Sequence, residues 1–216
     1  LKLIWVEKPE TAVRNDLVFT RDTRVYLLTG ANRGGKTTVT QAVGQLFLLA
    51  QGGLFVPAES FRYTPADAVL THFPADEDRT LDLGRLGEEC QRFRQIFQEC
   101  TEKSLLLLNE SFSTTSFEEG YYIASDAVRA ILHRGTRCIY NTHMHKLALD
   151  LTQTAAGQAS DGPRPASLIV HSDGAHRSFK IECAPPQGSS FARDIAEKYG
   201  VTYDLLLAAR EKDGEE

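Results

Sequence analysis

The chain has 216 residues, of which 42% are hydrophobic and 25% are charged, and its formal net charge is −5. This composition is typical of a globular protein with one sizeable core. The acidic balance argues against a broad nucleic-acid-binding surface on this domain. No apolar run is long enough to span a bilayer and no signal peptide is visible, so we expect a cytoplasmic protein with no membrane partner.

Strand-like and helix-like segments alternate along the chain, which predicts an α/β domain with a mainly parallel sheet. Two or three strands are expected within residues 1–29, and later strands at 68–73, 105–108 and 137–141. Helices are expected at residues 38–50, 83–101 and 121–134, the first ending near Gly52. Residues 151–166 predict a loop, residues 167–182 a β-hairpin, and residues 190–212 two short helices.

Two further features concern the cell compartment and the extent of the chain. Its four cysteines lack Cys-x-x-Cys spacing, which favours reduced thiols over a disulfide or zinc framework. The chain opens on Leu1 rather than on methionine, so we expect it to be part of a longer protein.

The octapeptide Gly30–Thr37 fits Gly-x-x-x-x-Gly-Lys-[Ser/Thr], the pattern of a phosphate-binding loop. Glycines let the backbone turn its N–H groups inward, Lys36 would reach the β- and γ-phosphates, and the Thr37 hydroxyl would bind Mg²⁺. The apolar run 24–29 precedes the loop and a helical pattern follows it, which places a helix N-terminus at the phosphates. The alternative, a glycine-rich turn with a surface lysine, does not explain these flanking segments.

Polar side chains follow two other predicted strands. Asn109 and Glu110 come directly after the run 105–108, where the carboxyl end of a strand faces the ligand in open α/β sheets. Glu110 is a candidate general base; the alternative is a strand that simply ends in polar loop residues. His143 follows the strand 137–141 and is a candidate sensor of the γ-phosphate or of the attacking water. An ordinary loop histidine, or a metal pair with His145, is the alternative.

These motifs, in this order, resemble the ATPase domain of the MutS mismatch-repair family, which belongs to the ABC-type ATPases. The resemblance runs from about Val13 to Arg210. It rests on the run 29–38 (TGANRGGKTT), on the run 54–58 (LFVPA), and on Thr142-His143. Thr115, Ser116 and Gly120 are similar to the family's D-loop, and residues 188–210 to its closing helix-turn-helix.

The resemblance implies a P-loop ABC-type ATPase domain at residues 1–184 and a C-terminal helical dimerisation appendage, a helix-turn-helix, at residues 185–216. It implies ATP and Mg²⁺ as cofactors, Glu110 and His143 as catalytic residues, and Thr37 and Asn109 at the metal. It also implies a nucleotide-binding loop, which consists of Gly30, Ala31, Asn32, Arg33, Gly34, Gly35, Lys36, Thr37 and Thr38.

The expected partner is a second copy of the chain, paired head to tail so that each copy completes the other's site. In that pairing residues 81–86 would be the signature loop that reaches the partner's ATP, and residues 113–116 would lie at the dimer seam. DNA would be bound through domains absent from this chain.

The sequence departs from the family's pattern at three places. Asn109 stands where the family has an aspartate, the stretch 81–86 (LDLGRL) lacks the family's serine, and Ala12 and Val13 stand where an aromatic residue would stack on adenine. From the resemblance, the first hypothesis is an ATPase of a MutS-related, DNA-associated protein. The second is a nucleotide-gated dimerisation module with weak or absent hydrolysis, and the third is another ABC-type ATPase.

Overall fold

The computed structural model describes residues 12–30, 34–74, 84–157, 162–173, 176–186 and 199–203. The chain divides into two compact units, Leu1–Pro186 and Gln187–Glu216. Every helix and strand named below belongs to the first unit. The two predicted helices within residues 190–212 lie almost wholly outside the described residues.

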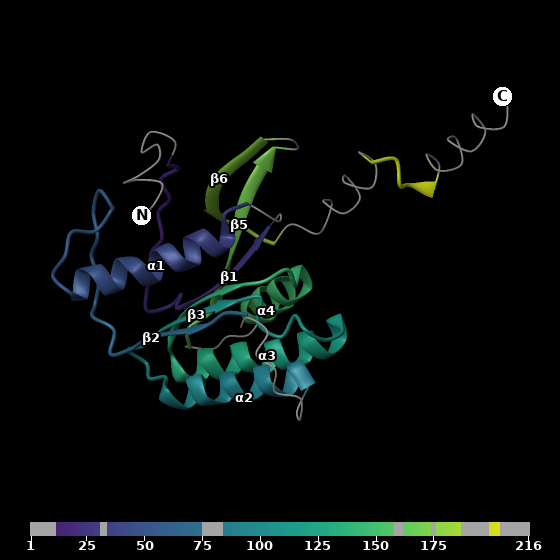
Figure 1. Ribbon diagram of the computed structural model, residues 1–216, viewed down its shortest axis with the longest axis horizontal. Helices are drawn as coiled ribbons and strands as arrows, with labels where there is room; N and C mark the ends of the chain where they lie inside the picture. Colours follow the sequence, from purple (N-terminus) through teal and green to yellow (C-terminus); the bar gives the residue numbers. More distant parts are fainter. Residues whose placement is uncertain are drawn as a thin grey trace. The chain divides into compact units, whose positions relative to one another are not determined.

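The first unit is built on one six-stranded sheet, in the order β2-β3-β4-β1-β5-β6 (Figure 1). The strands β2, β3, β4, β1 and β5 are parallel, and β6 pairs antiparallel with β5. Their bounds are β1 Val25–Gly30, β2 Val69–His72, β3 Leu105–Asn109, β4 Arg137–Asn141, β5 Pro165–Asp173 and β6 His176–Cys183. The prediction of a mainly parallel α/β sheet that ends in a β-hairpin is confirmed. The turn residues Gly174 and Ala175 lie outside the described residues.

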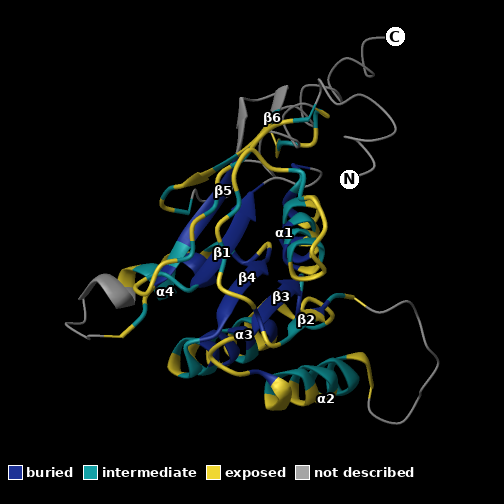
Figure 2. Ribbon diagram, turned by 90° about the vertical axis from the view of Figure 1, so that its left-hand side faces the viewer, coloured by how far each residue is buried: buried dark blue, intermediate teal, exposed yellow. Residues whose placement is uncertain are grey.

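Helices cover both faces of the sheet. Helix α1 (Lys36–Gln51) lies on one face, and α2 (Gly84–Glu99), α3 (Phe117–Arg134) and α4 (His145–Gly157) lie on the other (Figure 1). Side chains alternate across a strand, so Leu105 and Leu107 of β3 enter the core under α1, whereas Leu106 and Leu108 enter the core under the other helices. Burial on both faces explains why the first four residues of β3, Leu105–Leu108, are all apolar (Figure 2).

Helix α3 begins four residues before the predicted start at Tyr121. Ser116 forms its N-cap and accepts a hydrogen bond from the backbone N–H of Glu119. Glu118 and Glu119 lie in the first turn, where carboxylates interact favourably with the helix dipole. The first apolar residue of the sequence pattern therefore marked the buried face of the helix and not its start.

Of the two or three strands expected within residues 1–29, the structure shows β1 and no strand in residues 12–24, while residues 1–11 lie outside the described residues. Leu17 and Phe19 pack on the core under α1 from a segment that does not join the sheet. One prediction of local structure was wrong. Residues 151–157 are not a loop but the end of α4. This helix packs Leu147, Ala148 and Leu151 against the core on one face, and that packing outweighs the loop-like composition of the segment.

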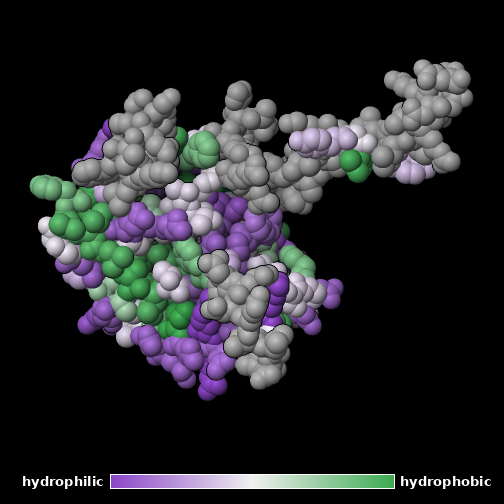
Figure 3. Space-filling view, viewed as in Figure 1, coloured by the Kyte–Doolittle hydropathy of each residue, from purple (hydrophilic) through white to green (hydrophobic). Residues whose placement is uncertain are grey.

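The surface of the first unit carries an apolar area over the C-terminal end of α1 and the segment that follows it (Figure 3). Leu48 and Leu54 are exposed there, and Phe55 is 97% exposed. Within the described helices, none is both long enough and apolar enough to cross a membrane. All four cysteines are free, and Cys100 and Cys138 are buried.

Candidate nucleotide site

The site is built where β1 passes into α1. Gly30 closes β1 with φ +132°, and a Cβ added there would lie 3.2 Å from the backbone nitrogen of Val170 on β5, so the strand fits only with glycine. Gly35 forms the N-cap of α1 in a left-handed conformation and makes no side-chain cap. The N-terminus of a helix carries N–H groups and the positive end of the helix dipole, which is where anions bind. Ala31, Asn32 and Arg33 lie outside the described residues.

Lys36 is the first residue of α1 and is only 5% exposed. Its Nζ donates a hydrogen bond of 2.8 Å to the carbonyl oxygen of Gly30, so the side chain crosses the loop. Burial lowers the pKa of Lys36, and the negative charge of Glu110 opposes that shift. The lysine charge is thus held at the carboxyl end of β1 and close enough to the candidate base for their charges to interact.

A cluster of neutral polar side chains lies beside the first turn of α1. Asn109 and Asn141 are register partners at the carboxyl ends of β3 and β4. Asn109 Oδ1 accepts hydrogen bonds from Thr37 Oγ1 at 2.9 Å and from Asn141 Nδ2 at 2.5 Å. Asn141 Oδ1 is buried and has no hydrogen-bond partner among the described residues. Thr37 and Asn109, which the family resemblance implies at the metal, are therefore adjacent.

Glu110 and His143 form the second part of the site. His143 Nε2 lies 2.9 Å from Glu110 Oε1, and the side chain of Glu110 is 19% exposed while that of His143 is half exposed. Glu110 has a left-handed backbone with φ 52°, and its N–H donates to Asn141 O at 2.8 Å. These contacts hold Glu110 directly after β3, with its carboxylate against His143.

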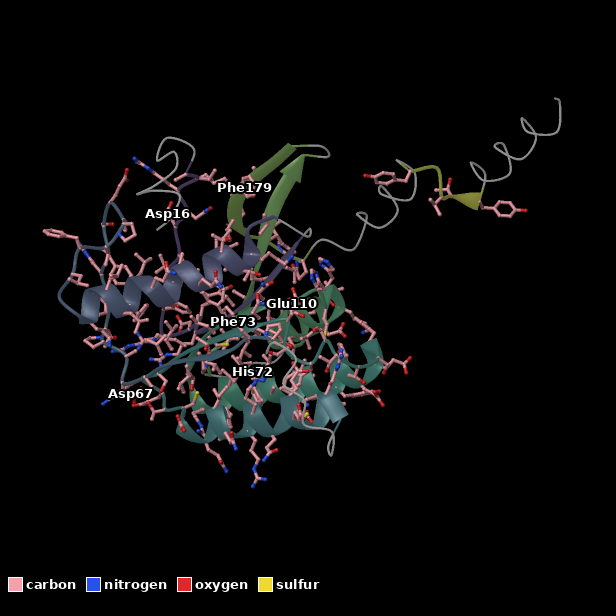
Figure 4. The ribbon with its side chains drawn as sticks, viewed as in Figure 1. Asp16, Asp67, His72, Phe73, Glu110 and Phe179 are labelled. Atoms are coloured by element: carbon pink, nitrogen blue, oxygen red, sulfur yellow. The ribbon has the colours of Figure 1, made fainter. Side chains whose placement is uncertain are left out.

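A pocket of about 350 Å³ joins these groups. Six of its seven lining residues are ones that the sequence predicted: Gly35, Lys36, Thr37, Thr38, Glu110 and His143. The seventh, Phe179, comes from β6, and Figure 4 shows it with Glu110 among the labelled side chains. Phe179 is 44% exposed, and its Cδ1 lies 3.3 Å from the position of a Cβ on Gly35. Sequence reasoning missed Phe179, because no local pattern links a hairpin residue to a loop more than a hundred residues earlier.

His145 also lies near this pocket, at the start of α4. Burial lowers its pKa, and the charges of His143 and Lys36 lower it further. Its Nδ1 is buried without a hydrogen-bond partner among the described residues. His143 approaches Glu110, and within the described part of the chain no group of three or more histidine, cysteine or acidic side chains could hold a metal ion.

The geometry thus joins a phosphate-type loop, a buried lysine, a hydroxyl and a carboxylate–histidine pair on one edge of a parallel sheet. A family model described as MutS domain V matches residues 26–211 of this chain. The chain belongs to the MutS domain V family.

Relatives of this MutS domain V include the endonuclease MutS2 of Thermus thermophilus, which is 29% identical over 198 residues, covering 92% of this chain and 26% of the relative. The DNA mismatch repair protein MutS of Chlorobium chlorochromatii is 30% identical over 203 residues, or 94% of this chain and 23% of the relative. The mismatch repair protein Msh6 of Gallus gallus is 37% identical over 131 residues, or 60% of this chain and 10% of the relative. The chain therefore spans about a quarter or less of the length of these relatives.

Three other stretches of this MutS domain V were predicted to take part in pairing with a second copy, and the structure describes only some of their residues. Residues 113–116 contribute Ser113, Thr115 and Ser116 to a second pocket of about 220 Å³, which shares Glu110 and His143 with the first. Of the stretch 81–86, residues 81–83 lie outside the described residues, and 84–86 begin α2. Most of residues 188–210 also lies outside them.

Proposed function

We propose that this chain is the ATP-binding and ATP-hydrolysing P-loop domain, of the ABC type, of a MutS-related protein. The observation that carries the proposal is the pocket in which the N-terminus of α1, the Lys36 ammonium and the Glu110–His143 pair face one space. A polyphosphate fits this arrangement, because backbone N–H groups, the helix dipole and a buried cation all attract anions.

Each residue of the proposed site has a chemical role. Lys36 and the N–H groups around Gly35 bind phosphate oxygens. Glu110 accepts a proton from, or orients, the attacking water, and His143 holds the Glu110 carboxylate and contacts the γ-phosphate. The loop residues 31–33 and Thr38 complete the proposed binding loop. Phosphoryl transfer needs mainly positioning and charge stabilisation, and this pocket supplies both.

Mg²⁺ is the second proposed cofactor, and the donor set fits it in part. Thr37 Oγ1 and Asn109 Oδ1 are oxygen ligands, which Mg²⁺ prefers, but both are neutral, whereas Mg²⁺ sites usually include a carboxylate. Thr37 and Asn109 would hold a bound Mg²⁺, and the ion would neutralise phosphate charge. The neutral donor set predicts weaker metal binding than an aspartate at position 109 would give.

The same neutral cluster supports a second candidate function, a nucleotide-gated dimerisation module with slow hydrolysis. ATP would then be bound without rapid turnover. Two measurements distinguish these functions: titration calorimetry gives ATP binding, and steady-state phosphate release gives turnover. We expect both binding and turnover, whereas binding without turnover would favour the module, and absence of ATP binding would show the proposal to be wrong.

The proposed partners are a second copy of the chain, paired head to tail, and DNA bound by further domains of the parent protein. Residues 1–184 would form the ATPase domain, and residues 185–216 a helical dimerisation appendage. The exposed apolar area at Leu48, Leu54 and Phe55 supports a contact with another part of a larger assembly, because monomers rarely expose such areas.

Replacing Asn109 by aspartate is expected to raise apparent Mg²⁺ affinity about tenfold in the ATPase reaction, since groups that support a metal ligand typically change affinity by 10–100-fold. The aspartate keeps an acceptor for Thr37 and Asn141 and adds a charge. The measurement is turnover as a function of Mg²⁺ concentration. Asn141→Asp is the matched control, because it adds the same charge but loses the donor to Asn109, so it should not raise affinity. An unchanged Mg²⁺ dependence in Asn109→Asp would contradict the assignment of position 109.

Phe179 is the proposed contact for the adenine ring. Phe179→Ala is expected to weaken ATP binding by about 1–3 kcal/mol, the range measured for stacking of a base on an aromatic ring. Binding of inorganic tripolyphosphate, which has no base, should stay unchanged, and Phe179→Tyr should retain ATP affinity. Equal losses for ATP and tripolyphosphate would show that Phe179 shapes the phosphate pocket instead.

A further inference from the structure

The turn that carries Glu110 has an unfavourable backbone. Glu110 and Phe112 have φ values of 52° and 64°, in the left-handed region, and neither residue is a glycine. Such a backbone is unfavourable for a residue with a side chain and persists only where the surrounding structure determines it. The contacts that hold this turn therefore fix the direction of the candidate base.

One side chain of α2 makes two of these contacts. Glu89 Oε1 accepts a hydrogen bond of 2.7 Å from the backbone N–H of Phe112, and Glu89 Oε2 accepts one of 2.8 Å from Thr114 Oγ1. We call these two hydrogen bonds the Glu89 contacts. A carboxylate that accepts from a backbone N–H makes a stronger bond than a neutral acceptor does, so Glu89 stabilises the left-handed conformation at Phe112.

Neighbouring side chains fix Glu89 and the turn to each other. The buried His72 of β2, labelled in Figure 4, lies between Ser111 and α2. Its Nε2 lies 3.3 Å from the carbonyl oxygen of Glu89, and its Nδ1 lies 2.6 Å from Ser111 Oγ. Burial, and then the charge of Arg92, lower the pKa of His72 to about 4, so the ring is neutral near pH 7. A carbonyl oxygen only accepts, so Nε2 carries the proton and Nδ1 accepts from the Ser111 hydroxyl.

Two further contacts close the turn on its other sides. Tyr140 donates a hydrogen bond of 2.6 Å to the carbonyl oxygen of Ser111. Gly120 of α3 lies so close that an added Cβ would be 2.4 Å from the carbonyl oxygen of Phe112. The turn is thus enclosed by β2, α2, β4 and α3. Among the described contacts of these four elements, Glu89 of α2 is the one charged side chain that contacts two residues of the turn, Phe112 and Thr114.

We propose that Glu89 is a positioning residue for ATP hydrolysis: it sets the direction of Glu110 from α2 without contacting the nucleotide. Glu89 lies five residues after Gly84, the first residue of α2, which falls within the stretch 81–86 that we expect to face a second copy of the chain. A displacement of α2 on pairing would therefore reach the candidate base through one carboxylate. This inference rests on the proposed ATPase function.

The test compares Glu89→Ala and Glu89→Gln with Glu99→Ala, an exposed carboxylate at the far end of the same helix. Glu89→Ala is expected to lower kcat about tenfold to a hundredfold with little change in the Kd for ATP, because small misplacements of a reacting group cost about that much. Glu89→Gln should recover part of the rate, since its amide oxygen still accepts from Phe112. Glu99→Ala should behave as wild type. A wild-type kcat in Glu89→Ala would overturn the proposal.

Amide hydrogen exchange separates this inference from the function on which it rests. The Phe112 amide should exchange about tenfold faster in Glu89→Ala, since each 1.4 kcal/mol of lost hydrogen bonding changes the opening equilibrium tenfold. If the wild type binds ATP but shows no turnover, hydrolysis is disproved, and exchange at Phe112 still decides whether Glu89 holds the turn. If Glu89→Ala does not fold, Thr114→Val, which removes only one of the Glu89 contacts, should lower kcat at unchanged Kd, and an unchanged kcat would overturn the proposal.

Discussion

Replacing Lys36 by alanine is expected to abolish useful ATP binding, lowering affinity by a hundredfold or more. The ammonium of Lys36 is buried under the loop and faces the same pocket as Thr37 and Glu110. A hydrogen bond to a charged group contributes about 1.5–3 kcal/mol to binding, and about 1.4 kcal/mol corresponds to a tenfold change in affinity. Because Lys36→Ala would lose contacts to two phosphates, ATP affinity should fall by a hundredfold or more. Titration calorimetry with ATP measures it.

The control for this experiment is Lys103→Ala. Lys103 is exposed and precedes β3, so it lies at the end of the sheet away from the pocket. This variant should bind ATP as the wild type does. Because Lys36 Nζ also donates to Gly30, urea unfolding of both variants should accompany the titration. A folded Lys36→Ala protein with wild-type ATP affinity would disprove the phosphate site.

Replacing Glu110 by glutamine is expected to leave ATP affinity within about threefold of wild type and to lower turnover by 10²–10⁴-fold, the contribution typical of a general base. Glutamine has the same shape and keeps an oxygen for His143, so the turn and the pocket are retained. It cannot accept a proton at neutral pH. Steady-state phosphate release, with ATP binding measured on the same preparation, gives both quantities.

Glu118→Gln is the matched control, since it makes the same chemical change on the first turn of α3. It should bind and hydrolyse ATP at wild-type rates. If Glu110→Gln turns over ATP as fast as wild type does, Glu110 is not the base. If neither the wild type nor Glu110→Gln turns over ATP although both bind it, the nucleotide-gated module is the correct function.

These two experiments address different parts of the site, and the sequence predicted the two parts for different reasons. The loop is a contiguous motif, so Gly30–Thr37 was recognisable without a fold. Asn109, Glu110 and His143 were recognisable because they follow apolar runs, and parallel strands bring their carboxyl ends to one edge. Their roles stay predictions until they are measured.

Where local composition and tertiary packing compete, the sequence predicted less well. The small and polar residues after Leu151 indicated a loop, yet α4 continues to Gly157 from a first half whose Leu147, Ala148 and Leu151 pack on the core. Residues 1–29 indicated two or three strands, yet within residues 12–24 Leu17 and Phe19 pack on the core from a segment that does not pair with the sheet. In both cases burial against a distant element decided the structure, and burial is not visible in a short window of sequence.

The sequence by itself determined the α/β class, the hairpin, the phosphate-type loop and the position of Glu110 after its strand. Only the tertiary structure brought Phe179 from β6 to the loop and Glu89 from α2 to the turn. Only it paired Asn141 with Asn109 and His143 with Glu110. The physical reason is that strand patterns and a loop motif depend on neighbours in the chain, whereas these contacts depend on the register of the sheet and on the helices packed across it.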